Sequence, residues 1–413
     1  MTVYKDVIII GAGPAGLAAA VEVKKNGVED VLVIEREPYA GGILNQCIHD
    51  GFGVTKFKEA LTGPEYAGRY IDEAKKLKVE ILSGAMVIDL TPDRGVTVIS
   101  PEGMTVYKAG AVILAMGCRE RTRGALSIPG TRPAGIYTAG VAQHFVNLKN
   151  IMIGRKVIIL GSGDIGLIMA RRLTLEGAEV IAVLEKLPYT SGLPRNITQC
   201  LEDYGIPLLL KHTVVNIEGR ERLKSVTIAE VDDKGKVIRG NSQKIECDTL
   251  ILSVGLIPEN ELSIDCGIKL DPVTSGAVVD EELQTSIPGI FACGNVLQVH
   301  DLVDHVSEEG EHAGRSAVVF VKNSSEGYES ALPVKPGSGI RYVVPQFISG
   351  KKDITVSMRV SFPSRDKKIF IKDGEKIIKS VSYKKLSPAE MARIKLNKKE
   401  LRGIKGLEVV VGD

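Results

Sequence analysis

The sequence predicts an α/β protein built from two similar units, followed by a small β-rich region. Residues 7–37 and 157–186 each hold a β-branched strand, a GxGxxG turn, an apolar helix and a second apolar strand that ends in glutamate. The length of 413 residues suffices for two or three domains with separate cores. After residue 339, polar and apolar residues alternate as in short strands.

The composition is that of a soluble globular protein. Hydrophobic residues make up 44% of the chain and charged residues 25%, which is ordinary for an α/β protein. The longest uncharged run, residues 7–21, falls short of the roughly 20 apolar residues that a membrane span needs. Lys5 and Asp6 form a poor cationic lead for a secretory signal. We expect a cytoplasmic protein.

The glycine spacing of the repeat predicts two dinucleotide sites. Gly11 permits the tight turn after the first strand, Gly13 lets a pyrophosphate approach the backbone, and Gly16 lets helix and strand pack closely. The phosphates would lie at the helix N-terminus, and Glu35 would accept hydrogen bonds from a ribose. Glycines that only form turns are the plainer alternative, and two intact units argue against it. The second unit repeats the spacing with Gly161, Gly163, Gly166 and Glu185.

The acid of the second unit bears on the choice of nicotinamide cofactor. A carboxylate at Glu185 repels the 2′-phosphate of NADP, so the sequence favours NAD(H). Lys186 follows it directly and keeps NADP open as an alternative.

Two further stretches distinguish the two sites. "AGAVILAMGC", residues 109–118, predicts a strand ending in AxG, and "TSIPGIFACGNV", residues 285–296, predicts a strand ending in GN. With the two fingerprints they resemble the two-dinucleotide (FAD/NAD) flavoprotein family that includes the disulfide reductases. The resemblance implies two Rossmann-like domains, with FAD at the first fingerprint and NAD at the second. The implied divisions are 1–122 (first FAD-binding segment), 123–256 (NAD-binding domain), 257–330 (second FAD-binding segment) and 331–413 (C-terminal domain, β-rich and basic).

The same resemblance implies which residues bind each cofactor. At Met116 and Asn295 the sequence departs from the family pattern, which has threonine and aspartate there. The second change keeps an acceptor but loses a charge, so we expect FAD to bind with an altered potential. The residues assigned to FAD are Gly11, Gly13, Ala15, Gly16, Glu35, Arg36, Gly42, Val87, Ala115, Gly117, Gly294 and Asn295. Those assigned to NAD are Gly161, Gly163, Asp164, Ile165, Gly166, Glu185 and Gly255.

One cysteine, Cys47, follows the first site in "GGILNQCIHDGFG", residues 41–53. Disulfide reductases of the family oxidise their flavin through a cysteine pair, either at this place or in a CxxC of the NAD domain. The six cysteines here form no CxxC pair, and the nearest to Cys47 is Cys118. Cys47 is therefore either a lone redox thiol, the one catalytic candidate, or a packing residue near the flavin. His49 invites a role as a base, but hydride transfer needs alignment more than acid–base help.

A polar segment, "HDLVDHVSEEGEH" at 300–312, has the residue types of a metal site. His305, Glu309 and His312 fall at helical spacing. The alternative that we favour is the start of a helix, whose N-terminus in this family points at the flavin and stabilises negative charge on its reduced form. We therefore assign no metal.

The region after residue 322 is turn-rich and then basic. Residues 323–339 predict a linker, "IRYVVPQFI" and "ITVSMRVSF" predict strands, and "SPAEMARIK" (387–395) predicts a helix start. Residues 335–413 hold 19 Lys and Arg against 8 Asp and Glu, a net charge of +11, so residues 1–334 carry −9. Nucleic acid is a weak explanation, because no interleaved aromatics or binding motif accompany the lysines. An acidic protein partner and a solvated lysine face both stay open.

Three motifs narrow the resemblance: "GGILNQCIHDGFG", "LAMGCRERTRGAL" and "PGTRPAGIYTAG". Together they look like the FAD-dependent NAD(H) oxidoreductase subunit found with anaerobic-type glycerol-3-phosphate dehydrogenase. This implies electron transfer between NAD(H) and a partner flavoprotein dehydrogenase, in an oligomer or hetero-complex. Three alternatives stay open: a self-sufficient NADH oxidase or peroxidase using Cys47, the flavin subunit of a proline- or sarcosine-type amino-acid dehydrogenase, and a non-catalytic dinucleotide-binding assembly module.

Overall fold

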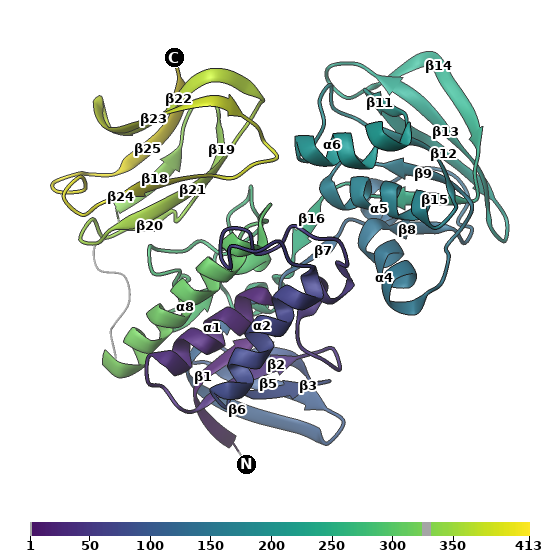
Figure 1. Ribbon diagram of the computed structural model, residues 1–413. Helices are drawn as coiled ribbons and strands as arrows, with labels where there is room; N and C mark the ends of the chain where they lie inside the picture. Colours follow the sequence, from purple (N-terminus) through teal and green to yellow (C-terminus); the bar gives the residue numbers. More distant parts are fainter. Residues whose placement is uncertain (1, 324–331) are drawn as a thin grey trace. The chain divides into compact units, whose positions relative to one another are not determined.

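The computed structural model describes residues 2–323 and 332–413 and divides into two compact units (Figure 1). Unit 1 joins Met1–Cys118 to Pro258–Asp413, and unit 2 is Arg119–Ile257. The chain leaves unit 1 once and returns, as expected for an inserted domain. The two compact units place the C-terminal residues together with the first segment, so they do not test a separate domain after residue 330. The predicted division at 122, 256 and 330 therefore stays a prediction.

A seven-stranded sheet forms the centre of unit 1, in the order β3-β2-β1-β6-β5-β4, with β17 paired to β6. β1, β2, β3, β6 and β17 run parallel. Parallel strands are covered on both faces, which explains why residues 7–10 and 31–34 are continuously apolar and buried. The strands are β1 Thr2–Ile10, β2 Val31–Glu35, β3 Glu80–Ser83, β4 Met86–Leu90, β5 Gly95–Ser100, β6 Gly103–Leu114 and β17 Ile290–Ala292.

Two helices of unit 1, α1 and α8, pack side by side although they are far apart in sequence (Figure 1). A glycine allows their close approach, because a Cβ on Gly310 would overlap the carbonyl oxygen of Ala15. Helix α2 begins with a capping box, in which Thr62 N donates to Glu65 Oε2 at 2.8 Å and Glu65 N donates to Thr62 Oγ1 at 3.4 Å. The helices are α1 Pro14–Lys25, α2 Gly63–Lys76, α7 Glu261–Asp265 and α8 Val303–Asn323, with 3₁₀ turns at Gly42–Gln46 and Gly294–Val296.

Unit 2 repeats this topology on a parallel sheet of five strands, in the order β11-β10-β9-β15-β8. In both units the strand before the glycine turn lies between the strand that ends in glutamate and a later strand. This confirms the predicted α/β fold with two Rossmann-like domains. An antiparallel sheet, β12-β13-β14, completes the unit.

The chain passes between the units at two short strands, β7 (Cys118–Glu120) and β16 (Leu256–Pro258), which pair with each other. The other strands of unit 2 are β8 Ile136–Thr138, β9 Lys156–Leu160, β10 Glu179–Glu185, β11 Leu208–Leu210, β12 His212–Gly219, β13 Leu223–Val231, β14 Val237–Glu246 and β15 Thr249–Leu252. The helices are α3 Arg123–Leu126, α4 Ala139–Lys149, α5 Asp164–Leu175 and α6 Pro194–Cys200, with a 3₁₀ turn at Glu202–Tyr204. Among the residues that the structure describes, no helix combines the length and apolar character of a membrane span.

The C-terminal region of unit 1 consists of two sheets, β20-β18-β25-β22-β23 and β19-β21-β24. The prediction of strands after residue 339 is confirmed. Residues 324–331 of the predicted linker lie outside the described residues, and a strand, β18, occupies some of the remainder. The strands are β18 Leu332–Pro336, β19 Ile340–Val344, β20 Phe347–Ile348, β21 Ile354–Val360, β22 Ser364–Asp373, β23 Lys376–Leu386, β24 Ala392–Leu396 and β25 Leu407–Gly412.

The helix expected from Ser387 is wrong. Residues 387–391 form a turn region, and β24 follows. Ile394 and Leu396 of β24 are buried in the core while the strand pairs antiparallel with β21. The helix-start pattern is a weak local preference, and pairing with burial of alternate side chains outweighs it.

Candidate functional site

The first glycine turn lies between β1 and α1 and has the close packing that its glycines predict. Gly11 adopts a φ of 105°, and its N–H donates to Ile34 O at 2.8 Å. A Cβ on Gly11 would lie 2.5 Å from Ala115 O, and one on Gly16 would overlap Gly11 O. Larger residues at either position would push the helix away from the strands.

Gly13 differs from its neighbours because a Cβ there would meet no described atom within 4 Å. It precedes the first residue of α1, and in the described structure no side chain caps that helix and no acidic residue lies in its first turn. Gly42 packs against this turn, since its added Cβ would lie 2.9 Å from Gly13 Cα. Uncapped N–H groups at an open helix N-terminus fit the diphosphate of a dinucleotide.

Glu35 ends β2 and is buried beside the turn. Its Oε2 accepts a hydrogen bond from Ala12 N at 2.8 Å, and its Oε1 accepts one from Glu37 N at 2.9 Å. A carboxylate offers about four acceptor positions, so two backbone donors orient the group and leave capacity for ribose hydroxyls.

The GN motif reaches the same place from the far end of the sequence. It follows β17, and Gly294 adopts a φ of 74°. A Cβ on Gly294 would lie 2.8 Å from the Cβ of Ala15, so the motif touches the first turn of α1. Asn295 Oδ1 accepts a hydrogen bond from His300 N at 3.0 Å, and its Nδ2 donates to Cys118 Sγ at 3.7 Å.

The structure thus gathers most FAD-assigned residues at the carboxyl ends of four parallel strands, β1, β2, β6 and β17. Ligands of doubly wound sheets bind at this end. Val87 is buried in β4, which begins beside Glu35 because Ala85 N donates to Glu35 O at 2.9 Å. Arg36 is exposed and lies 3.9 Å from Glu259. The gathered residues are Gly11, Gly13, Ala15, Gly16, Glu35, Gly42, Ala115, Gly117, Gly294 and Asn295.

Unit 2 has the same construction at the ends of β9, β10 and β15. Gly161 adopts a φ of 103°, and its N–H donates to Leu184 O at 2.7 Å, as Gly11 does to Ile34. Ser253 closes the turn, since Gly166 N donates to Ser253 Oγ at 3.1 Å. The NAD-assigned residues at this edge are Gly161, Gly163, Asp164, Ile165, Gly166 and Glu185, and Gly255 follows the end of β15 by three positions.

Glu185 repeats the contacts of Glu35 and adds two more. Its Oε2 accepts from Ser162 N at 3.1 Å, and its Oε1 accepts from Leu187 N at 2.9 Å. The hydroxyls of Ser162 and Ser191 also donate to Oε2, at 2.5 and 3.0 Å. Four donors therefore fix the buried carboxylate in place.

Two other polar residues of unit 2, Asp164 and Lys186, contact other parts of the chain. Asp164, at the first turn of α5, accepts from Leu193 N at 2.8 Å and from Asn196 Nδ2 at 2.6 Å. The Nζ of Lys186 lies 3.2 Å from the position of a Cβ on Gly235. The Lys186 side chain thus packs on the turn before β14, which weakens the case that it attracts the 2′-phosphate of NADP.

Cys47 follows the 3₁₀ turn at Gly42–Gln46 in unit 1 and donates to Ile43 O at 3.4 Å. Desolvation raises the pKa of its thiol to about 12. A thiol of that pKa is almost entirely protonated near neutral pH, whereas nucleophilic and redox cysteines react as thiolates. The structure describes all six cysteines, and none of them forms a disulfide.

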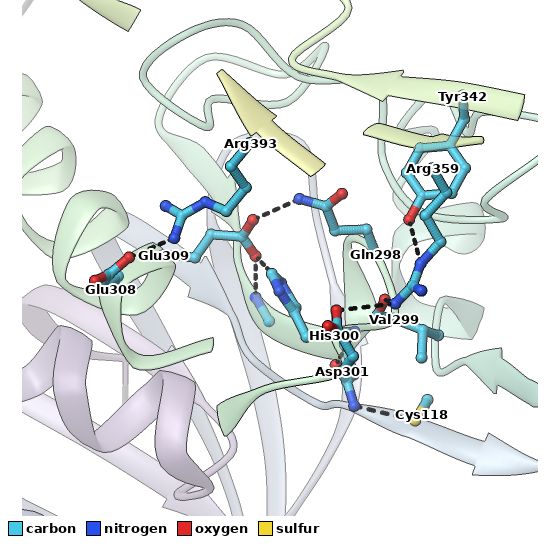
Figure 2. A network of polar contacts seen from close by, with 12 residues as sticks. Cys118, Gln298, Val299, His300, Asp301, Glu308, Glu309, Tyr342, Arg359 and Arg393 are labelled. Carbon is cyan, nitrogen blue, oxygen red and sulfur yellow. Dashed lines mark hydrogen bonds and ion pairs between the residues drawn. The ribbon is translucent and has the colours of Figure 1, made fainter. Parts of the chain in front are cut away.

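Glu309 belongs to a buried polar network (Figure 2), and among the described residues no group of three His, Cys, Asp or Glu is placed to hold a metal ion. Glu309 accepts hydrogen bonds from Gly294 N at 2.6 Å, Gln298 Nε2 at 2.8 Å and His300 Nε2 at 3.0 Å. Burial acts to raise the pKa of Glu309, but these partners outweigh it and hold the pKa below its usual value. His312 lies 3.9 Å from Glu282.

Sequence reasoning missed several residues at both sites. Ser162 occupies the variable position of a GxGxxG turn, so its type could have suggested a contact with Glu185. Ser191, Ser253 and Gln298 carried no signal, and His300 stood in the polar segment at 300–312 without a role of its own, because only the folded chain brings these side chains to Glu185, Gly166 and Glu309.

Comparison with known proteins agrees with this geometry. The family model for pyridine nucleotide-disulphide oxidoreductases matches residues 5–314. A thioredoxin reductase of Listeria monocytogenes is 28% identical over 332 residues, 79% of this chain and 96% of its own. An opine oxidase subunit of Agrobacterium tumefaciens is 29% identical over 317 residues, 71% of this chain and 61% of its own.

Among solved structures, the thioredoxin reductase of T. acidophilum has a similar fold. The TM-score is 0.64 at 23% identity, over 78% of this chain and 99% of that one. The two sites, the repeated topology and the family match lead to one conclusion. The chain belongs to the pyridine nucleotide-disulphide oxidoreductase family and is an FAD-dependent NAD(P)H oxidoreductase.

Proposed function

We propose that this protein passes electrons between NAD(H) and a partner protein that carries its own redox centre. The observation that carries the proposal is the single thiol beside the FAD-assigned residues. Cys47 has no second cysteine in the sequence around it, and its raised pKa keeps it protonated. A dithiol cannot therefore receive the electrons here, so they must leave by another route.

Bound FAD supplies the hydride exchange with the nicotinamide and the onward release of electrons. The residues of this chain bind and orient. The first turn of α1 and Gly13 would hold the FAD diphosphate, and Glu35 the adenosine ribose. Glu185, fixed by Ser162 and Ser191, would select NAD over NADP through its charge.

The comparisons support a partner without naming it. The opine oxidase relative is by name one subunit of an oxidase, and this chain spans 61% of its length. Within this proposal, the three motifs that narrow the family resemblance favour a partner that oxidises glycerol 3-phosphate. We also propose that the assembly lies in the cytoplasm and that the basic surface of residues 335–413 contributes to docking.

Anaerobic stopped-flow absorbance at the flavin band tests the proposal. The purified protein is mixed with NADH or NADPH and then with ferricyanide, oxygen, peroxide or an oxidised thioredoxin. We expect fast bleaching by NADH, slower bleaching by NADPH, rapid reoxidation by ferricyanide and slow reoxidation by oxygen or the disulfide. Co-purification from cells grown on glycerol then identifies the partner by its own dehydrogenase activity.

A self-sufficient NADH oxidase or peroxidase is the second candidate, because Cys47 lies close to the FAD-assigned loop at Gly42. In that case, turnover with oxygen or peroxide is fast and disappears in Cys47→Ser. Such a result would replace the partner proposal. Purified protein that holds no flavin, or whose flavin NADH does not bleach, would instead favour the assembly module.

A further inference from the structure

The C-terminal region of unit 1 contacts the segment that follows the GN motif, and arginines make the contacts (Figure 2). Arg359 of β21 donates from Nη2 to Val299 O at 3.0 Å and to Asp301 Oδ1 at 3.3 Å. Met391 N donates to the same Asp301 oxygen at 3.2 Å. Some of the positive side chains of residues 335–413 therefore form ion pairs with residues 1–334, which carry the net negative charge of the chain.

Arg359 is itself held firmly. Its Nε donates to Tyr342 Oη at 3.2 Å and its Nη1 to Pro388 O at 2.9 Å. Its side chain is 13% exposed and that of Asp301 is 9% exposed. A planar guanidinium that serves four acceptors in a nearly buried setting fixes direction as well as distance, which a lysine would not do.

The residue between these two anchor points is His300, and its contacts lead to the flavin motif. His300 N donates to Asn295 Oδ1 at 3.0 Å, and His300 Nε2 bonds Glu309 Oε2 at 3.0 Å. Glu309 in turn accepts from Gly294 N at 2.6 Å. Asn295 is thus bonded to His300 and Gly294 to Glu309, the partner of His300, and His300 lies between Val299 and Asp301 in the sequence.

Two buried polar atoms of residues 298–300 lack a hydrogen-bond partner among the described residues, as expected beside a ligand site. The His300 side chain is 3% exposed, and its Nδ1 has no hydrogen-bond partner among the described residues. Gln298 Oε1 is buried and unpartnered in the same sense. Unpaired buried polar atoms are costly, and here they lie beside the motif that the family uses for the flavin ribityl chain.

We propose that Arg359 is a positioning residue for FAD, which holds residues 299–301 so that His300 and the start of α8 lie in place against the bound flavin. The C-terminal region of the chain thereby helps to set flavin affinity and potential. This rests on the FAD site of the family and on no assumption about the partner, so it can fail or hold independently of the proposed function.

The same region of the chain offers a more exposed ion pair as a control. Lys352 Nζ donates to Glu282 Oε1 at 2.6 Å, another ion pair between residues 335–413 and the acidic body, and neither bonds to 298–302 within the described structure. A purely structural role for Arg359 predicts that Arg359→Gln lowers the unfolding midpoint and leaves the flavin potential unchanged. A positioning role predicts that the flavin potential shifts as well.

The experiment measures FAD affinity by reconstitution of apoprotein, and the flavin midpoint potential by dye equilibration, for wild type, Arg359→Gln, Arg359→Lys and Lys352→Gln. We expect about tenfold weaker FAD binding and a more negative potential in both Arg359 variants, because a displaced α8 N-terminus stabilises reduced flavin less. Lys352→Gln should leave both values unchanged. Unchanged affinity and potential in Arg359→Lys, or equal shifts in Lys352→Gln, would overturn the proposal. If Arg359→Gln does not fold, Asp301→Asn probes the same bond from the other side.

Discussion

The Ser162 hydroxyl donates a hydrogen bond to Glu185 at 2.5 Å, whereas the equivalent Ala12 offers Glu35 only its backbone N–H at 2.8 Å. The two acids end equivalent strands of a repeated unit and orient through the same backbone contacts. The added hydroxyl gives the acid of unit 2 one more donor that holds it in place. Glu35 and Glu185 therefore occupy equivalent positions in the two units, and a substitution at one is a control for the same substitution at the other.

Glutamine at each acid should separate the two sites. Glu185→Gln removes the charge that repels a 2′-phosphate, so the ratio of NADH to NADPH reduction rates should fall about tenfold or more. Flavin content should stay unchanged. Glu35→Gln should do the reverse, weakening FAD retention and leaving the nicotinamide preference alone. Absorbance after gel filtration and stopped-flow reduction measure the two effects, and an unchanged preference in Glu185→Gln would refute the role of its charge.

Alanine should be tolerated by the fold at one glycine of the first turn and destabilise it at another. Gly13 has extended backbone with a φ of −77° and open space around its added Cβ, so Gly13→Ala should fold with nearly wild-type stability but bind FAD poorly. Gly16→Ala should cost about 3 kcal/mol or more, because the Cβ overlaps Gly11 O. Thermal unfolding of apoprotein and flavin content report these outcomes. A Gly13→Ala protein that retains FAD normally would show that the diphosphate lies elsewhere.

Cys47 should behave as an inert thiol. With a pKa of about 12, its thiolate fraction at about pH 8 is roughly a thousandfold lower than for an ordinary cysteine. Alkylation by iodoacetamide should be slow and should accelerate about tenfold per pH unit. Cys47→Ser should leave flavin reduction by NADH unchanged. Peptide mass spectrometry follows the alkylation, and rapid labelling near neutral pH would restore the redox-thiol hypothesis.

Asp280 should make the protein less stable as the pH rises. Burial, with Glu281 and Glu282 nearby, raises its pKa to about 7 against the N–H groups of Glu282 and Gln284. Because the folded form holds the proton more tightly than the unfolded form, the stabilisation is full below about pH 4 and is lost as the pH approaches 7.

Asp280→Asn keeps the acceptor and removes the titration. The variant should therefore gain roughly 1–4 kcal/mol relative to wild type at about pH 8 and little at about pH 4. Unfolding midpoints by circular dichroism at the two pH values test this. Asp271→Asn is the matched control, since Asp271 accepts from Val273 N and Thr274 N in a more exposed turn. Equal pH profiles for wild type and Asp280→Asn would contradict the assignment.

The sequence alone determined the two glycine turns and their acids, because each depends on local spacing, whereas the inserted domain was implied by the resemblance to the flavoprotein family. Gly11 and Gly161 need a positive φ after a strand wherever the chain makes this turn, and the helix must start within a few residues. The lone Cys47 was also visible, since the absence of a second cysteine is a property of the sequence.

Only the tertiary structure decided what lies around those turns. Ser191 reaches Glu185 and Arg359 reaches Asp301 across 6 and 58 positions of sequence, and neither contact follows from a local pattern. The segment after Ser387 carries helix-start residues yet forms a strand, because pairing with β21 buries Ile394 and Leu396. Long-range packing supplies more free energy than capping does, so it decides the places where the two disagree.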